Sequence, residues 1–312
     1  MVVVNLAVFL LVFQESFAQE PPENVQEPPE NVQEHQNEVV FSYDQSDIYG
    51  PQDWGKISSF CNGIRQSPVN MYIDQAIKRY TFPLIIDGLD KVPLNVTITN
   101  SGHSAAIKFE FDDGIPIRLT GGPLSGSYIA ENLHFHWGKS DTGSEHTINA
   151  RRYSAEVHLV TYSSKYQSLA DAMQQPGGLA VLGFVYELDN TANTTSNVYL
   201  PLLSQVIEPK SSYTDSLNVF SLRDVIETDE FDFLSYSGSL TTPDCYQTVT
   251  WLVSTNPIKI SSNELAELRK LKNHNHRELV ENFRPLQKLN RRNVTYYQHL
   301  RTYGKLDLPA EL

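Results

Sequence analysis

The sequence lacks a basic excess, and this absence bounds its partners. Lys and Arg total 24 against 37 Asp and Glu, which gives a formal net charge of −13 at pH 7. Proteins that bind nucleic acid or anionic membranes usually carry a basic surface, so we expect neither partner. The acidity is uneven, because residues 19–40 contain six Glu and no Lys or Arg. The remainder of the chain is therefore only mildly acidic.

Long hydrophobic runs are also scarce. Residues 2–13 form one, interrupted at Asn5, which is too short to span a membrane. Small residues at positions 16 and 18 follow it, so residues 1–18 are predicted to be a secretory signal peptide, although a positively charged start is missing. The alternative is a buried helix at the amino end. Residues 306–312 lack the hydrophobic tail of a lipid-anchored precursor. We therefore expect a secreted, extracellular and soluble protein without a membrane anchor.

Cysteine is scarce as well, since only Cys61 and Cys245 occur. In an oxidising compartment two lone cysteines predict one disulfide, and the alternative is a pair of unpaired buried thiols. Three Asn-x-Thr triplets are candidate glycosylation sites and fit the same compartment; they begin at Asn95, Asn193 and Asn293.

Proline marks off an amino-terminal segment. Residues 21–27 read Pro-Pro-Glu-Asn-Val-Gln-Glu, and residues 28–34 repeat them. Paired prolines exclude a helix interior, and one Val in each repeat provides no seam for a coiled coil. We interpret residues 19–40 as an extended, disordered acidic tail. It is either a solvated spacer or a segment that binds cations or a matrix partner.

The rest of the chain has the pattern of a sheet. Hydrophobic residues make up 40% of the sequence and charged residues 20%, which supports a sizeable core. Helix-like patches are few, at 168–174 and at 261–271, where Ser261 or Ser262 is the expected N-cap. No linker interrupts the region, so we predict one α+β, sheet-dominated domain at 41–305 and a short tail at 306–312. Strand-like runs bounded by Gly, Asn, Asp and Pro occur at 95–99, 105–111, 115–119, 133–137, 156–162, 179–188 and 248–254.

Histidines at strand spacing suggest a metal site. His134 and His136 are two residues apart on a strand-like run, so both point to one face while the apolar residues between them point to the other. His158 lies on a second such run. Three neutral imidazoles suit zinc and leave its fourth position open for water, as in a catalytic site. Spacing alone leaves a metal site and a coincidence about equally open.

Neighbouring residues favour the metal site. Asn132 shares a face with His134, and Glu156 shares one with His158. Metal-bound imidazoles commonly donate their other N–H to an acceptor of this kind. His274 and His276 have the same spacing, but they stand in a polar run after a predicted helix. We assign those two to a solvated turn and not to a metal.

Several blocks of the sequence resemble the signature blocks of the α-class carbonic anhydrases of the secreted type, in the family's order and spacing. They are 132–138 (Asn-Leu-His-Phe-His-Trp-Gly), 143–147 (Gly-Ser-Glu-His-Thr), 155–160 (Ala-Glu-Val-His-Leu-Val) and 236–243 (Tyr-Ser-Gly-Ser-Leu-Thr-Thr-Pro). Blocks at 65–69, 100–103 and 282–285 extend the similarity. The resemblance implies a single domain with a largely antiparallel, twisted central sheet of about ten strands and short peripheral helices. It places Zn²⁺ at the bottom of a conical cleft.

The resemblance implies a role for each matching residue of the zinc site. The ligands match His134, His136 and His158. Thr241 matches a hydroxyl that accepts a hydrogen bond from zinc-bound hydroxide and donates one to a glutamate, here Glu145. With its own proton committed to the glutamate, such a hydroxyl can only accept from the hydroxide.

The substrate side of the resemblance is apolar. Thr242 matches a residue that contacts bicarbonate, and the wall where CO2 rests matches Val160, Val181, Leu240 and Trp251. The implied activity is the zinc-dependent reversible hydration of CO2 to bicarbonate and a proton by zinc-hydroxide attack. A minor esterase activity would be a side reaction.

Three further features of the family, outside the zinc and the substrate wall, match residues of this chain. His103 matches the proton shuttle, a task that suits histidine because its unperturbed pKa lies near 6.5. His146 matches a buried structural histidine. Cys61 and Cys245 fall where secreted members carry a disulfide, which would anchor the loop that holds Thr241.

The sequence departs from the family pattern in two places. Asn132 stands where a Gln, one methylene longer, usually supports the first zinc histidine. The path of ordered water to the shuttle is commonly lined by a Tyr and two Asn, and the matching positions are interpreted as Gln45, Ser101 and Ala106. We expect zinc binding and CO2 hydration to survive these changes and proton transfer to be retuned.

Two other functions compete with an enzyme of this family. Non-catalytic relatives that act as binding or matrix proteins typically lose one or more zinc histidines, whereas this chain keeps all three together with Thr241 and Glu145. A zinc hydrolase of unrelated fold is disfavoured because the sequence contains no His-Glu-x-x-His motif. The sequence leaves the oligomeric state open.

Overall fold

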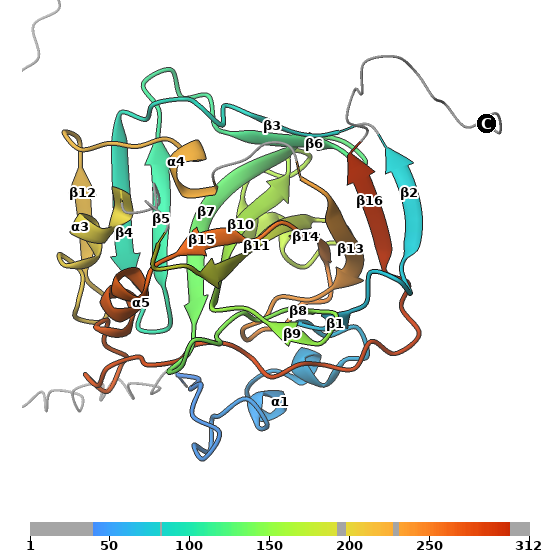
Figure 1. The fold of residues 1–312 in the computed structure, drawn as a ribbon, viewed down its shortest axis with the longest axis horizontal. Coiled ribbons are helices and arrows are strands. Elements are labelled where there is room, and N and C mark those ends of the chain that lie inside the picture. The colour runs from blue at the N-terminus through green and yellow to red at the C-terminus, as the bar shows by residue number, and fades with distance from the viewer. Residues whose placement is uncertain (1–39, 82, 192–197, 227–230, 300–312) are drawn as a thin grey trace, which may run out of the picture. The chain divides into compact units, whose positions relative to one another are not determined.

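The protein, seen here as a computed structural model, is built around one large sheet (Figure 1). The structure describes residues 40–81, 83–191, 198–226 and 231–299. The strands of the large sheet are β2 (Ile77–Thr81), β3 (Leu84–Asp87), β4 (Asn95–Asn100), β5 (Ala105–Glu110), β6 (Arg118–Gly121), β7 (Tyr128–Trp137), β10 (Ala155–Ser163), β11 (Leu179–Leu188), β12 (Ser212–Asp215), β13 (Phe233–Gly238), β14 (Val249–Ser254), β15 (Ile258–Ile260) and β16 (Thr295–His299).

Ten of these strands lie in one continuous path. Its order is β12-β4-β5-β7-β10-β11-β14-β13-β16-β2, while β15 pairs with β11, and β3 joins through β6 to β7. Within the path β11·β14 and β16·β2 are parallel, and the other pairs are antiparallel. Strand direction rotates across the sheet from β12 to β2 (Figure 1). The predicted sheet-dominated fold with a largely antiparallel sheet of this size is confirmed.

Short elements surround the sheet. A second, small sheet has the order β1-β8-β9 and consists of β1 (Asn70–Met71), β8 (Thr147–Ile148) and β9 (Arg151–Arg152). The helices are α1 (Trp54–Ile57), the 3₁₀ turn η1 (Ser59–Asn62), α2 (Leu169–Ala172), α3 (Leu200–Leu203), α4 (Arg223–Ile226) and α5 (Ser262–Arg269). Among the described residues, no helix has the length and apolar character needed to cross a membrane.

Helix α5 begins where its sequence directs. The Ser261 side chain accepts from the Glu264 backbone N–H, and the Glu264 carboxylate accepts from the Ser261 backbone N–H, which completes a capping box. Leu265 and Leu268 are fully buried against the large sheet's core. The predicted helix and its N-cap are confirmed.

Alternation along β7 separates the core from the site. Leu133, Phe135 and Trp137 are buried in the larger hydrophobic cluster, and the residues between them turn to the opposite face. On β10 and β11, the face that continues the opposite face of β7 carries a second hydrophobic cluster, which includes Val160 and Val181. The centre of the sheet therefore has the larger hydrophobic cluster on one face and the polar side chains of β7 on the other.

The sequence predicts the central strands better than the edges. The runs expected at 95–99 and 179–188 are β4 and β11, the run at 133–137 is the last half of β7, and the run at 115–119 begins later, as β6. The strands β2 and β12, which are the edges of the ten-strand path, have no counterpart among the predicted runs, and neither do β3, β13, β15 and β16. The predicted signal peptide, nearly all of the acidic tail and the carboxyl-terminal tail lie outside the described residues.

Candidate metal centre

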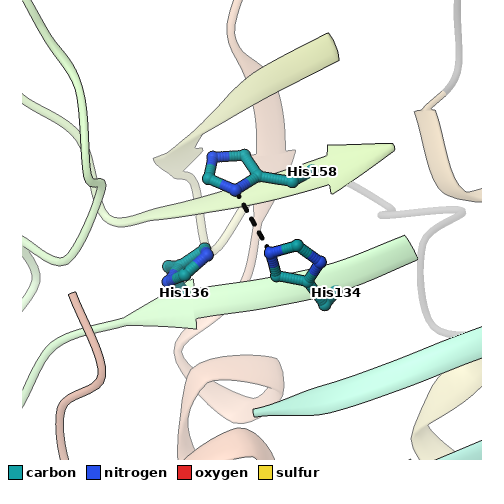
Figure 2. Close-up of side chains that lie close together, drawn as sticks. All are labelled: His134, His136 and His158. Carbon is teal, nitrogen blue, oxygen red and sulfur yellow. Dashed lines mark hydrogen bonds between the residues drawn. The ribbon is translucent and has the colours of Figure 1, made fainter. Parts of the chain in front are cut away.

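Two adjacent strands bring the three predicted histidines together. In the antiparallel register of β7 and β10, His158 lies directly opposite His134, and Glu156 lies opposite His136. Figure 2 shows the three rings turned toward one another from these strands. One nitrogen from each histidine lies within 4.8 Å of the others, which is the arrangement of a group that holds a metal ion.

The outer nitrogen of each imidazole has a partner that fixes its ring. His134 Nδ1 lies 3.2 Å from Asn132 Oδ1, His136 Nδ1 lies 2.8 Å from the Asn282 carbonyl oxygen, and His158 Nε2 lies 2.8 Å from Glu156 Oε1. Because every partner is an acceptor, each of these nitrogens carries the proton and the opposite nitrogen offers a lone pair. The shorter Asn132 therefore reaches His134, although at the long end of hydrogen-bond distances.

The inward nitrogens are those that a metal would need. His134 Nε2 and His158 Nδ1 are 3.3 Å apart, and His136 Nε2 is buried without a hydrogen-bond partner. Burial lowers the pKa of His136, and burial together with the neighbouring histidines lowers the pKa of His134 well below its usual range. Both rings are therefore neutral at pH 7, which is the form that binds metal. Three inward nitrogens, one of them buried without a hydrogen-bond partner, fit Zn²⁺.

A second cluster of possible metal ligands also contains His158, but its side chains are already hydrogen-bonded to one another. It consists of His146, Glu156 and His158. Glu156 Oε1 already accepts from His146 at 2.7 Å and from His158 at 2.8 Å. Burial alone would raise the pKa of Glu156, but the two histidines hold it well below its usual range, so it is a carboxylate. The group is thus a hydrogen-bonded support of the first cluster, with His146 in the structural place predicted for it.

Comparison with known proteins agrees with this geometry. The sequence pattern of the family described as eukaryotic-type carbonic anhydrase matches residues 49–298. The chain belongs to this family. It is 34% identical over 262 residues to carbonic anhydrase 7 of Mus musculus and 33% identical over 261 residues to carbonic anhydrase 7 of Homo sapiens. Each alignment covers 81% of this chain and 96% of the relative.

The chain is therefore a carbonic anhydrase, an enzyme class that depends on zinc. Its three-histidine cluster is a group able to hold that zinc, so the predicted cofactor and enzyme class are confirmed. The small-molecule substrates CO2 and bicarbonate follow from the same membership.

Glu145 stands at the edge of the histidine cluster. Its Oε1 accepts from the Arg284 backbone N–H at 2.8 Å. Its Oε2 is buried without a partner and lies 3.6 Å from His136 Nε2. Thr241 is also buried, on the loop that follows β13. Oε2 is thus the oxygen available to the Thr241 hydroxyl, and the bond between them stays a prediction.

The residues predicted to form the apolar wall gather beside His158. Val160 pairs with Val181 across β10 and β11, and Val181 pairs with Trp251 across β11 and β14. Leu240 packs against the same cluster. The Trp251 ring centroid lies 4.8 Å from that of His158. Thr242 is half-buried in the loop beside Thr241, where its carbonyl oxygen accepts from the Cys245 N–H at 2.8 Å.

The environment of His103 differs from the prediction. Tyr43, not Gln45, lies beside it, with ring centroids 6.3 Å apart, whereas Gln45 is exposed on a turn. Phe41 stacks on the imidazole with centroids 3.7 Å apart and planes within 9°. The match to Gln45 rested on position in the sequence alone, and the structure places Tyr43 beside His103 instead. The order Phe-x-Tyr, two aromatics one residue apart, is the signal that would have located both residues.

The other two positions matched to the water path are Ser101 and Ala106. Ser101 Oγ accepts from the backbone N–H groups of His103 and Ser104 and donates to the Ser104 carbonyl oxygen, so it is committed to its own turn. Ala106 lies opposite His134 in the register of β5 and β7 and offers no hydrogen bond there.

Asn282 links the histidine cluster to His103, a role that its sequence position did not reveal. Its carbonyl oxygen holds His136, and its Oδ1 accepts from the Trp137 N–H at 2.7 Å. Its Nδ2 donates to the carbonyl oxygens of His103 at 3.0 Å and Phe135 at 2.8 Å. One buried side chain therefore ties β7 to the turn that carries His103.

The pair rejected as ligands does not converge on one point. His276 Nδ1 lies 2.9 Å from Glu208 Oε2 on the exposed side of its turn. His274, in contrast, lies with its Nε2 3.0 Å from Nε2 of His103. The turn is thus not simply solvated, because one of its histidines reaches the predicted shuttle.

Cys61 and Cys245 form the predicted disulfide, which joins residues 184 apart in sequence. Of the glycosylation candidates, Asn293 is exposed, whereas Asn95 is half-buried at the start of β4 and donates to Glu110 Oε2 at 2.9 Å. Asn193 lies outside the described residues.

Proposed function

We propose that the chain catalyses the reversible hydration of CO2 to bicarbonate and a proton at a zinc ion held by His134, His136 and His158. The observation that carries this proposal is the buried, unpartnered Nε2 of His136, which faces inward beside the inner nitrogens of the other two ligands. A buried polar atom without a partner is costly unless a ligand satisfies it.

In carbonic anhydrase, the standard example of this effect, bound zinc lowers the pKa of a water to about 7 and so supplies a nucleophile at neutral pH. Glu145 Oε2 accepts a hydrogen bond from the Thr241 hydroxyl, so that hydroxyl has only its lone pairs left for a further hydrogen bond. Thr241 then orients the attacking oxygen. Glu145 is itself fixed by the Arg284 backbone N–H.

CO2 is small and apolar, so it needs no hydrogen bond to the protein before it reacts. We assign its resting place to the apolar surface of Val160, Val181, Leu240 and Trp251, which excludes water from one side of the site. Thr242 then contacts the bicarbonate product. His103 carries the released proton away from the site.

Zinc analysis with stopped-flow CO2 hydration tests this proposal. We expect hydration that a sulfonamide inhibitor suppresses, and a His136→Ala variant that loses zinc and activity together. The Cys61–Cys245 disulfide provides a check on folding of the variant. A zinc-free wild-type chain without hydration would contradict the proposal and favour the alternative, a binding or matrix protein of the same family.

We also propose that the chain is secreted after removal of residues 1–18. A disulfide between the only two cysteines supports an oxidising compartment. Residues 19–40 would then form the mature amino-terminal tail, which acts as a spacer or binds cations or a matrix partner. Expression in secretory cells, followed by amino-terminal sequencing of the medium, should find a chain that begins at Gln19. An intracellular chain that keeps Met1 would contradict secretion.

Glycosylation and a minor esterase activity belong to the same proposal. Glycosylation is expected at Asn293 because it is exposed, and a mass decrease after glycosidase treatment would detect it. Minor esterase activity is expected because the nucleophile that hydrates CO2 also attacks activated esters. It should disappear in the same His136→Ala variant.

A further inference from the structure

Beyond the zinc site, His103 and His274 form a pair of imidazoles at the wall of a cavity of about 770 Å³. The amino-terminal segment, the turn at Gly102 and the segment 273–281 line this cavity. Its charged and titratable lining groups, besides the two histidines, are Asp44, Asp47, Lys139, Arg277, Glu278, Glu281, Tyr43 and Tyr49.

The two rings are placed for direct proton exchange. Their Nε2 atoms are 3.0 Å apart, and their centroids are 4.5 Å apart. At this distance one nitrogen carries the hydrogen and the other offers its lone pair. Added charge on such a pair is shared in a charge-assisted bond, which is stronger than a neutral one.

The surrounding structure is built for this approach. Gly102 has φ +81°, and a Cβ there would come within 2.6 Å of His274 Nε2, so a larger residue would push the ring away. On the other side Phe41 stacks on His103 with planes 9° apart. The Asn282 side chain holds the His103 carbonyl oxygen at 3.0 Å. Gly102 thus leaves room for His274, while Phe41 and Asn282 hold His103 in place beside it.

His103 alone would store a proton poorly. Burial, with a smaller contribution from His274, lowers the pKa of His103 to about 3. At pH 7 only about one molecule in ten thousand would carry a proton on that ring. His274 stands on a segment whose neighbours Asn275 and His276 are exposed, so it borders solvent.

We propose that His274 is a second proton carrier, which takes the proton from His103 and releases it into the cavity. His103 gains a proton on Nδ1 as its Nε2 proton passes to Nε2 of His274, and His274 then gives its own Nδ1 proton to water or buffer. One proton enters the pair and one leaves. The rings then part, and each regains its starting tautomer by exchange with cavity water. His103 loses its Nδ1 proton and gains one on Nε2, while His274 loses its Nε2 proton and gains one on Nδ1, so no proton is carried back through the pair.

The charge of the cavity favours this exit. Four carboxylates and two basic groups line it, so its lining carries a net charge of −2 at pH 7 with neutral histidines. A negative wall repels the hydrogen phosphate dianion, which is the base form of a phosphate buffer, but it does not repel neutral imidazole, and it stabilises the imidazolium that forms. We therefore expect imidazole to accept the proton more effectively than phosphate at equal ionic strength.

The proposal rests on the proposed function, and buffer-limited kinetics test it. CO2 hydration is measured at low and high imidazole for the wild type, His274→Ala and the control His276→Ala. Oxygen-18 exchange between CO2 and water at equilibrium separates CO2 interconversion from proton release. We expect His274→Ala to slow turnover at low buffer by at least about tenfold, to recover at high imidazole, and to keep zinc and interconversion unchanged. His276→Ala should match the wild type throughout.

A conservative variant separates proton transfer from positioning. The amide of His274→Gln can still hydrogen-bond His103 but cannot pass a proton, so we expect the same loss as in His274→Ala. Full activity in His274→Gln at low buffer, or unchanged or faster turnover in His274→Ala, would overturn the relay. If the wild type fails to hydrate CO2 even at high imidazole, the proposed function itself fails.

An equilibrium measurement gives a readout apart from turnover. Histidine NMR titration should place the pKa of His103 higher in His274→Ala than in the wild type, because His274 contributes to lowering it. It should be unaltered in His276→Ala. An unmoved His103 pKa in His274→Ala would mean that the rings do not interact in solution, and it would overturn the relay.

Discussion

Gly183 on β11 has no side chain, and the carboxylate of Glu156, which accepts a hydrogen bond from the zinc ligand His158, occupies the space beside it. It pairs with His158 across β10 and β11. A Cβ added at Gly183 would lie 2.8 Å from Glu156 Oε1 and 3.7 Å from His158 Cδ2. Its φ lies outside the left-handed region, so alanine is acceptable to the backbone. Gly183→Ala therefore tests the carboxylate's position and little else.

The expected effect follows from how firmly Glu156 is held. To relieve the contact, Oε1 must retreat by roughly half an ångström. It accepts from His146 Nδ1 at 2.7 Å and His158 Nε2 at 2.8 Å, while Oε2 accepts from the His146 N–H at 2.8 Å. Weakening such an outer partner, in carbonic anhydrases among other zinc proteins, lowers metal affinity by about 10–100-fold, or about 1.4–2.7 kcal/mol.

Competition of the purified protein with a chelator measures this loss. We expect the zinc dissociation constant of Gly183→Ala to rise about 10–100-fold while the fold is kept. Adding Glu156→Asp withdraws the carboxylate by one methylene, so it should weaken zinc binding less in the Gly183→Ala background than in the wild type. If the Cβ were accommodated, zinc affinity would stay unchanged and thermal stability would rise by about 0.4–1 kcal/mol, which would refute the reasoning.

Three further predictions concern the site and its frame. Asn132→Ala removes the acceptor 3.2 Å from His134 Nδ1 and should weaken zinc binding about 10–100-fold by the same competition assay; unchanged affinity would mean that this long bond contributes nothing. Reduction of the Cys61–Cys245 disulfide, which closes a loop of 184 residues, should lower the free energy of unfolding by up to about 5 kcal/mol, and a urea midpoint unmoved by reductant would contradict this. In the metal-free protein, burial lowers the pKa values of His134 and His136 below 6.5, so the unfolded chain binds more protons as pH falls. Stability should therefore be complete above pH 6.5 and decline below it, and urea unfolding that is flat from pH 7 to 5 would exclude buried neutral histidines.

The central strands and the metal ligands could be predicted from sequence because their signals are local. Alternation in β7 fixes the common face of His134 and His136, and Asn132 and Glu156 lie two residues from the histidines they support. Strand periodicity carries this information without any tertiary contact. The edge strand β2 is exposed at residues 77–80 and lacks such alternation, so the pattern did not reveal it.

The surroundings of His103, the predicted shuttle, depend on contacts between distant segments. Phe41 and Tyr43 approach His103 from the amino-terminal segment, while His274 approaches from a turn 171 residues beyond it. The support of His136 is a backbone carbonyl, that of Asn282, and a carbonyl has no residue identity to read. These features follow from the packing of loops, which spacing in one sequence does not determine.

Zinc content measured together with CO2 hydration tests the central claim most directly. The account predicts one zinc for each wild-type chain, stopped-flow hydration that disappears when a chelator removes the metal, and recovery when zinc is returned. His136→Ala should fail to recover under the same treatment. A folded wild-type chain that neither retains zinc nor hydrates CO2, even with zinc in excess, would contradict the account.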